Sequence, residues 1–297
     1  MIKYLLITFL FITNAYASDI VNITFLGTGT PRPDINKLGP SILIKTHSEE
    51  LLIDVGRGTT LRLSQIGNNY EKIDDIYISH LHYDHIIGLA DFWLTSNVWQ
   101  KKTDTKIYGP IGIKDFCEGL FQSYSEDIRY RYKNNKYSKL KCLNFPEKKI
   151  YESNLIISSF KNSHGHIENS HGFKIGYGDK SIVYSGDTTY SDNVINNSKN
   201  IDILIHEVIS ASRKIYDSNK KLRDVVSTHT NINQLIKILN ICKPKLTIIN
   251  HALLFGVNES FVLSKIKKKY SGKVIFSKDL MSVDLGKEIN IFNIGKK

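Results

Sequence analysis

The sequence has few cysteines, and none of them is spaced as a zinc-binding pair. The 297 residues contain only Cys117, Cys142 and Cys242. Three cysteines in a chain of this length do not make a disulfide-dense scaffold, and without C-x-x-C spacing they do not indicate a cysteine zinc site. In an exported protein Cys117 could pair with Cys142, although spacing alone does not fix the connectivity.

The sequence also lacks the features that separate domains or repeats. No segment is rich enough in proline, serine and glycine to be a linker, and no solenoid-type repeat recurs. Hydrophobic residues make up 41% of the chain, which is enough for a full core, and the composition is not that of a disordered, collagen-like or coiled-coil protein. We therefore expect one domain over residues 18–297.

Long apolar runs are missing except at the start of the chain. Lys3 precedes an apolar run at residues 4–12, and Ala15-Tyr16-Ala17 is an A-x-A cleavage pattern. The run is shorter than the roughly 20 residues that span a membrane. We expect residues 1–17 to be a signal peptide and the mature protein to be periplasmic or secreted, without stable membrane insertion. An uncleaved anchor or a buried strand is the alternative.

The chain has an excess of positive charge but no motif that would direct it to nucleic acid. The formal net charge is +11, a balance that can favour acidic partners. Much of it lies in runs such as residues 265–269 and 296–297, and tyrosines interleave basic residues only in the short stretch at residues 129–133. A solvated surface is therefore the preferred interpretation, and a nucleic-acid partner stays open as the alternative.

Short β-rich stretches alternate with stretches of helical spacing along the whole chain. The order of these stretches predicts an α/β fold, with two sheets packed as a sandwich and helices on the outside. The strands are expected at residues 21–26, 41–44, 51–54, 76–79, 106–108, 154–162, 172–177, 180–184, 201–205, 246–249 and 273–276. The helices are expected at 60–66, 84–99, 113–124, 232–242 and 257–269.

Histidines and acidic residues gather where the predicted strands end. Nine of the ten histidines lie between residues 80 and 251, and strand ends can bring distant residues to one rim. Residues 80–85 read His-x-His-x-Asp-His, and zinc prefers imidazole and carboxylate ligands with one position open for water. Four such ligands in six residues exceed what one tetrahedral metal needs, so the spacing indicates two metals.

This pattern resembles the metallo-β-lactamase superfamily. The resemblance runs over residues 23–276 and rests on His-x-His-x-Asp-His after a strand, preceded by a strand ending in Asp54 and a glycine loop. Residues 25–31 and 52–59 resemble the ribonuclease Z branch, which includes arylsulfatase-like relatives. The resemblance implies an αββα sandwich of two mixed β-sheets flanked by helices.

The resemblance also implies the metal ligands. It assigns His80 and His82 to the first metal, Asp84, His85 and His251 to the second, and Asp187 to a bridging position. The missing ligand of the first metal is expected to be His164, with His166 as the alternative, and His171 is expected in a turn or pocket. Asp54 would orient residues 80–85, which we call the ligand loop, by hydrogen bonds. An aspartate before a glycine loop can also be a simple turn cap.

A second group of residues is implied to carry the proton transfer. Glu207 and His229 match a glutamate and histidine that work together in the ribonuclease Z branch, and Asp84 joins them as a catalytic residue. For His229 the alternative is a residue of a helix-capping loop, because the triplet His-Thr-Asn departs from the ribonuclease pattern. His206 is expected to be structural or to line the pocket.

The resemblance thus implies a secreted, dinuclear zinc hydrolase that uses a metal-bound hydroxide to cleave phosphodiester, sulfate or related ester bonds. It would bind two Zn²⁺ per chain, with manganese or iron as alternatives, and act on a small anionic ester; a homodimer is compatible with the sequence. One alternative is a ribonuclease Z-type tRNA 3′-processing endonuclease, which conflicts with the signal peptide and for which residues 110–150 show no recognisable tRNA-gripping arm. Another is a non-catalytic metal-binding protein, which would require a broken ligand set.

Overall fold

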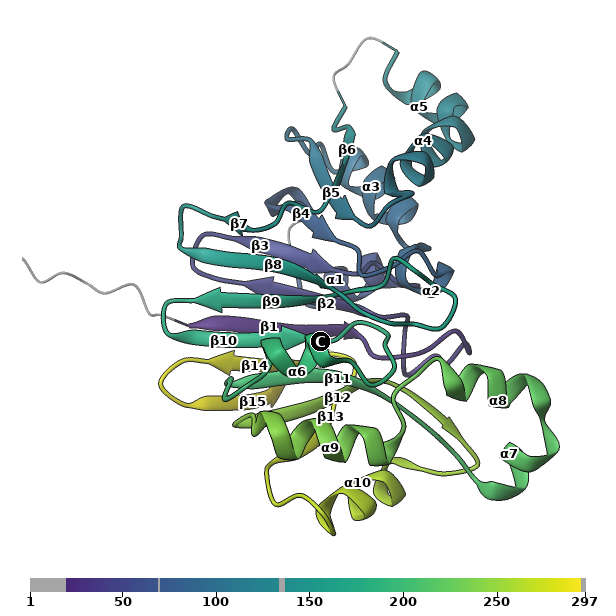
Figure 1. The fold of residues 1–297 in the computed structure, drawn as a ribbon. Helices are drawn as coiled ribbons and strands as arrows, with labels where there is room; N and C mark the ends of the chain where they lie inside the picture. The colour runs from purple at the N-terminus through teal and green to yellow at the C-terminus, as the bar shows by residue number, and fades with distance from the viewer. Residues whose placement is uncertain (1–19, 69, 134–136, 295–297) are drawn as a thin grey trace, which may run out of the picture.

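Two β-sheets pack face to face and carry helices on their outer faces (Figure 1). The computed structural model describes residues 20–68, 70–133 and 137–294, so the expected signal peptide lies outside the described residues. The predicted αββα sandwich is confirmed. Among the described residues, no helix is both long and apolar enough to cross a membrane.

The first sheet brings the two ends of the described chain together. Its eight strands lie in the order β15-β14-β1-β2-β3-β4-β5-β6, and the four from β3 to β6 run parallel. Their bounds are β1 Val21–Gly27, β2 Ser41–Lys45, β3 Glu50–Ile53, β4 Ile73–Tyr77, β5 Thr105–Gly109, β6 Leu140–Asn144, β14 Met281–Leu285 and β15 Ile289–Asn293. Because β3 and β4 are parallel neighbours, the loops after them leave the sheet at the same edge.

The second sheet has seven strands in the order β13-β12-β11-β10-β9-β8-β7. Its bounds are β7 Lys149–Ile150, β8 Leu155–Lys161, β9 His171–Tyr177, β10 Lys180–Tyr184, β11 Ile203–Ala211, β12 Leu246–Phe255 and β13 Val274–Phe276. The strands from β10 to β13 are parallel, while β8, β9 and β10 pair antiparallel. The four parallel strands again deliver their carboxyl ends to one edge.

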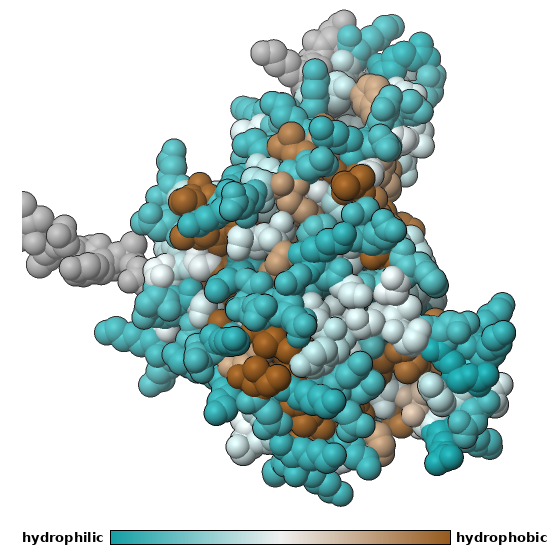
Figure 2. All heavy atoms as spheres, viewed as in Figure 1, coloured by the Kyte–Doolittle hydropathy of each residue, from teal (hydrophilic) through white to brown (hydrophobic). Residues whose placement is uncertain are grey.

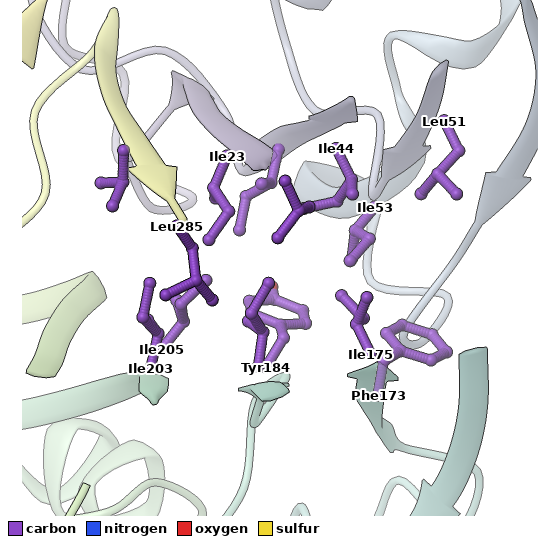
Figure 3. Packing of buried hydrophobic residues seen from close by; sticks show 14 of the residues in the cluster. Ile23, Ile44, Leu51, Ile53, Phe173, Ile175, Tyr184, Ile203, Ile205 and Leu285 are labelled. Atoms are coloured by element: carbon purple, nitrogen blue, oxygen red, sulfur yellow. The ribbon is translucent and has the colours of Figure 1, made fainter. Parts of the chain in front are cut away.

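The main core lies between the sheets. Ile23, Ile44 and Ile53 of the first sheet face Ile175 and Ile205 of the second (Figure 3), and all of these side chains are buried. Burying an aliphatic side chain of this size stabilises the fold by about 1.5–3 kcal/mol. This packing holds the two edges that carry the candidate ligands in a fixed relation.

Helices cover both outer faces of the sandwich. On the first sheet lie α1 Thr59–Gln65, α2 Tyr83–Ile86, α3 Leu89–Val98 and α4 Ile113–Ser123, with η1 Tyr70–Lys72 before β4 and α5 Ser125–Arg131 after α4. On the second lie α6 Asp192–Asn197, α9 Ile232–Cys242 and α10 Glu259–Lys267. The helices α7 Arg213–Ser218 and α8 Lys220–Ser227 form a hairpin that protrudes from the body (Figure 1), and hydrophilic residues dominate its surface (Figure 2).

Backbone packing divides the helix that was predicted at residues 84–99. The structure has two helices there, α2 and α3, separated at Ile87-Gly88. A Cβ atom on Gly88 would lie 2.2 Å from the carbonyl oxygen of Gly56. The glycine is therefore required by a close backbone contact, and this contact also holds the ligand loop against the chain after β3.

Two strands run further than predicted. The strands expected to end before His206 and before His251 continue to Ala211 and Phe255. They do so because β11 and β12 pair with each other on both sides of a register shift between His206 and Val208. The sequence pattern also does not indicate β6, β7, β14 and β15 or the helices α5, α6, α7 and α8, most of which are short and partly exposed.

A disulfide joins α4 to β6. Cys117 and Cys142 are bonded, with Cα atoms 6.5 Å apart, and Cys242 is a free, buried thiol. The pairing that the sequence left open is therefore Cys117–Cys142. A cross-link over 25 residues stabilises a protein by about 3 kcal/mol in the chain-entropy description.

Reduction of this disulfide should lower the unfolding midpoint while the metal centre keeps its ligands. Thiol labelling in denaturant should modify one cysteine before reduction and three afterwards, because only Cys242 is free. The variant Cys117→Ser should show the same lowered midpoint with or without reductant. Three labelled cysteines in unreduced protein would contradict the disulfide.

Candidate metal centre

The ligand loop is attached to the sheet through one buried carboxylate. Asp54, directly after β3, accepts hydrogen bonds from the backbone N–H of Ser79 (2.7 Å), the hydroxyl of Ser79 (2.9 Å) and Nδ1 of His85 (2.8 Å). The hydroxyl of Tyr184 donates a fourth, at 2.9 Å. Asp54 has φ 57°, a left-handed conformation that is unusual for a residue with a Cβ atom. These contacts are those required of a residue that orients the loop.

The predicted ligands form two adjacent groups. One contains His80, His82, His164 and Asp187, and the other contains Asp84, His85 and His251. Within each group, one candidate ligand atom per residue lies within 4.8 Å of the others. The structure thus brings together all seven residues that the sequence predicted, and it places His164 rather than His166 in the first group.

Asp187 lies between the two groups. Its Oδ2 atom is 3.9 Å from Nε2 of His80 and 3.9 Å from Nε2 of His164 on one side. On the other side it is 3.6 Å from Nε2 of His85 and 3.2 Å from Nε2 of His251. One carboxylate therefore reaches both sets of imidazoles, as a bridging ligand must.

A tight turn after β10 places this carboxylate. Gly186 has φ 58°, and a Cβ atom there would lie 2.4 Å from the carbonyl oxygen of His171. The Ser170 hydroxyl donates to the carbonyl of Asp187 at 2.7 Å. In the Ser-Gly-Asp sequence, Gly186 therefore permits the tight turn and Asp187 supplies the carboxylate.

The buried carboxylates and imidazoles of the centre shift one another's pKa values. Burial alone would raise the pKa of Asp187, but the imidazoles of His251 and His85 hold it well below its ordinary value. Burial would lower the pKa of His85, but the carboxylates of Asp187 and Asp54 hold it well above. The pKa of His80 falls instead, because burial is reinforced by the nearby His85. The buried carboxylate of Asp187 is therefore stabilised by positive charge on the groups that face it.

The donor atoms fit metal ions. Asp84 Oδ2, His85 Nε2 and Asp187 Oδ1 are buried and have no hydrogen-bond partner among the described residues. Buried polar atoms without partners are costly, and Nε2 of His85 lies 3.7 Å from Oδ2 of Asp84 and 3.6 Å from Oδ2 of Asp187. Imidazole nitrogen and carboxylate oxygen without thiolate suit zinc, and also manganese or iron.

The outer nitrogens of two imidazoles are fixed by backbone carbonyls. Nδ1 of His164 donates to the carbonyl of Thr228 at 2.8 Å, and Nδ1 of His251 donates to the carbonyl of Gly29 at 2.7 Å. A carbonyl can only accept, so Nδ1 carries a proton on each ring and Nε2 is the nitrogen left to bind a metal. That nitrogen faces Asp187, which is the arrangement of a metal-binding histidine.

Glu207 and His229 form a buried pair beside the ligands. Glu207 lies at the register shift in β11. Its Oε1 accepts from the backbone N–H of Thr188 (3.0 Å) and from Nδ1 of His229 (2.8 Å). Burial alone would lower the pKa of His229, but the Glu207 carboxylate raises it to about 9. The His229 ring centre lies 4.7 Å from that of His164. His229 is therefore protonated at neutral pH and next to the candidate metal site.

A cleft of about 540 Å³ exposes this arrangement to solvent. It is lined by His82, Asp84, His164, Asp187, His229 and His251, together with apolar residues such as Val225 and Leu253. His166 also lines the cleft but is exposed and belongs to neither ligand group. His171 begins β9 and packs against Phe145 instead. His206 is buried, with Nδ1 donating to the carbonyl of Glu207 at 2.8 Å.

Comparisons with known proteins give one family and several structural relatives. The sequence model of the family described as Anti-Pycsar protein Apyc1 matches residues 21–251. A ribonuclease Z of Mycobacterium bovis is 25% identical over 281 residues, covering 90% of this chain and 99% of that protein.

Two solved structures share the fold. The metallo-β-lactamase fold protein YhfI from Bacillus subtilis superimposes with a TM-score of 0.72 at 22% identity, covering 90% of this chain and 100% of that one. The short form of human tRNase Z gives a TM-score of 0.65 at 19% identity, covering 88% and 98%.

The two histidines between β8 and β9 should respond differently to substitution. His164→Ala should lose one of two bound metal ions, because it removes an Nε2 atom from the first ligand group. His166→Ala is the matched control and should retain both. Elemental analysis of each zinc-loaded protein measures the difference. Loss of metal in His166→Ala alone would overturn the ligand assignment.

Proposed function

This chain belongs to the family of the Anti-Pycsar protein Apyc1, and from that premise we propose that it hydrolyses phosphodiester bonds. It is a metal-dependent hydrolase of the metallo-β-lactamase superfamily, in the ribonuclease Z-like branch. The observation that carries the proposal is that the two ligand groups share one cleft with a protonated histidine, His229.

The proposal assigns seven residues to two metal ions. His80, His82 and His164 would hold the first, Asp84, His85 and His251 the second, and Asp187 both. Two ions held in this way would supply a nucleophile from water at neutral pH and would stabilise negative charge on the reacting phosphoryl group. Asp54 keeps the loop of ligands in place through the Ser79 backbone and the His85 ring.

His229 would protonate the leaving oxygen. Hydrolysis of a phosphodiester breaks a P–O bond and expels an alkoxide, which is a poor leaving group unless a proton arrives in the transition state. His229 lines the cleft with a pKa of about 9 and carries a proton that it can give from Nε2, because Nδ1 is bonded to Glu207. Glu207 is itself held by the Thr188 N–H, so the ring has one orientation.

Phosphodiesters are favoured over sulfate esters because the similar ribonuclease Z proteins are named for cleaving RNA, whose backbone is a phosphodiester. The same similarity supports a second candidate, ribonuclease Z-type processing of RNA. The helical hairpin α7–α8 next to the cleft carries Lys220, Lys221 and Arg223, and the chain has a net charge of +11. Such a cationic edge favours a polyanion.

A panel of substrates tests the proposal. The zinc-loaded protein would be assayed on bis(4-nitrophenyl) phosphate, a dinucleotide, a precursor tRNA, 4-nitrophenyl sulfate and a β-lactam. The phosphodiesters should be cleaved, and the sulfate ester and the β-lactam should not. Asp187→Asn should abolish cleavage of every phosphodiester. Faster hydrolysis of the sulfate ester than of every phosphodiester would overturn the proposal. Cleavage of the precursor tRNA in preference to the small diesters would select the second candidate.

We further propose that the protein works outside the cytoplasm, in the periplasm or after secretion. The disulfide Cys117–Cys142 supports this, because disulfides persist in oxidising compartments and are rare in the cytosol. Fractionation of the producing cell, followed by N-terminal sequencing, should find a mature chain that begins after Ala17. A chain that starts at Met1 in the cytosol would contradict export.

Removal of the His229 imidazole should slow the reaction without loss of metal. His229→Ala should lower turnover of a dinucleotide by roughly 100- to 10,000-fold, the usual range for a lost general acid. Turnover of bis(4-nitrophenyl) phosphate should fall much less, because nitrophenolate leaves without a proton. Equal losses on both substrates would show that His229 positions the substrate instead.

The alkaline limb of the pH profile should depend on Glu207. In the wild type, dinucleotide turnover should fall as the pH rises through about 9, where His229 loses its proton. Glu207→Gln removes the charge that raises this pKa, so the limb should move to lower pH. The acidic limb and the metal content should stay as in the wild type. An unchanged alkaline limb would remove His229 from the proton-transfer step.

A further inference from the structure

One buried carboxylate outside the ligand set anchors a loop that touches the metal centre. Asp279 lies between β13 and β14, and its side chain is 5% exposed. Its Oδ1 accepts from the backbone N–H (2.9 Å) and the hydroxyl (2.7 Å) of Thr28. Its Oδ2 accepts from the backbone N–H of Leu38 (2.8 Å) and from Nη2 of Arg62 (2.9 Å). Asp279 therefore fixes both ends of residues 28–38, which we call the anchor loop.

The two arms of the anchor loop are packed against each other. The N–H of Gly29 donates to the carbonyl of Leu38 at 2.7 Å. A Cβ atom on Gly29 would lie 2.2 Å from the carbonyl oxygen of Lys37. With both ends fixed and the arms in contact, the carbonyl of Gly29 has little freedom to move.

That carbonyl holds a ligand of the second metal group. It accepts from Nδ1 of His251 at 2.7 Å, and His251 has φ 54°, a backbone conformation that persists only where its surroundings enforce it. The loop makes a second contact through the carbonyl of Pro31, which accepts from the hydroxyl of Tyr83 at 2.9 Å. Tyr83 directly precedes Asp84, another ligand of this group.

We propose that Asp279 is a positioning residue for the second metal. It holds the Gly29 carbonyl where that carbonyl sets the tautomer and the orientation of His251. The inference rests on the ligand set of the proposed function, but not on its substrate. Two ligands of the other group are held independently of this loop, because the outer nitrogen of His164 is bonded to Thr228 and that of His80 lies 3.0 Å from the hydroxyl of Ser79.

The proposal predicts an asymmetric effect. In Asp279→Asn the amide oxygen can still accept from Thr28, but the amide nitrogen meets the N–H of Leu38 and the guanidinium of Arg62, which are also donors. The affinity of the second metal should fall about 10- to 100-fold, the usual effect of a lost outer contact. The affinity of the first metal should stay within experimental error of the wild type.

A matched control separates positioning from general stability. Asp202 is also a buried aspartate with comparable bonds, accepting from the N–H of Ser181 (2.8 Å), its hydroxyl (3.0 Å) and Lys245 (2.7 Å). It directly precedes β11, at the opposite end of the sheet from the ligands. Asp202→Asn should lower the unfolding midpoint but leave both metal affinities unchanged.

The measurement is a zinc titration of the full chain against a chromophoric chelator, repeated with Co²⁺ to read the absorption of each site. Selective weakening of one site in Asp279→Asn, and not in Asp202→Asn, supports the proposal. Unchanged affinities, or equal weakening of both sites, overturn it. If Asp279→Asn does not fold, Thr28→Val removes one donor to the same carboxylate. It should weaken the same site by a smaller factor, and an unchanged second affinity in this variant also overturns the proposal.

The outcome is separate from that of the proposed function. Selective metal loss in Asp279→Asn from a protein that cleaves none of the phosphodiesters would support this inference and overturn the proposed function. If the wild type cleaves phosphodiesters and Asp279→Asn and Asp202→Asn have the same metal affinities, the proposed function is supported and this inference is overturned.

Discussion

The attraction between the buried carboxylate of Asp187 and the imidazoles around it is the interaction on which the site depends. Its Oδ2 lies within 3.9 Å of Nε2 on four histidines. A carboxylate removed from water in this way is stable only opposite positive charge. Asp84, His85 and Asp187 each also have a buried side-chain atom with no hydrogen-bond partner among the described residues, which is costly for the same reason. Metal ions bound at both ligand groups would meet this requirement.

The sandwich makes this convergence possible. The parallel neighbours β3 and β4 deliver Asp54 and the loop that begins at His80, while β10, β11 and β12 deliver Asp187, Glu207 and His251. Both sheets present carboxyl ends at one edge, and the core between them keeps these edges in register. The register shift in β11 adds one detail that topology alone does not provide, since it directs Glu207 toward His229.

The side-chain ligands could be predicted from the sequence, because residue type and spacing indicate those at residues 80–85 and the family resemblance implies the others. The motif at residues 80–85 indicates metal ligands by itself, and Asp187 follows from the similarity of its Ser-Gly-Asp turn to the family pattern. The carbonyls of Gly29 and Thr228 could not be predicted, because every residue has a carbonyl and only the fold selects these two. The length of β11 and β12 depends on their mutual pairing, and the break between α2 and α3 depends on contact with Gly56. Such features arise from tertiary contacts that local patterns do not record.

Proton binding and metal binding compete in this centre. Burial lowers the pKa values of His85 and His251, but the carboxylate of Asp187 more than reverses this, so each pKa lies above its ordinary value. A metal ion must compete with protons for Nε2, since Nδ1 is already hydrogen-bonded to Asp54 or to Gly29. The backbone of Asp54 and His251, both at positive φ, is held by these same bonds. The protein thus keeps the ligand geometry ready before the metal arrives, and metal loading is favoured as pH rises because fewer protons must leave.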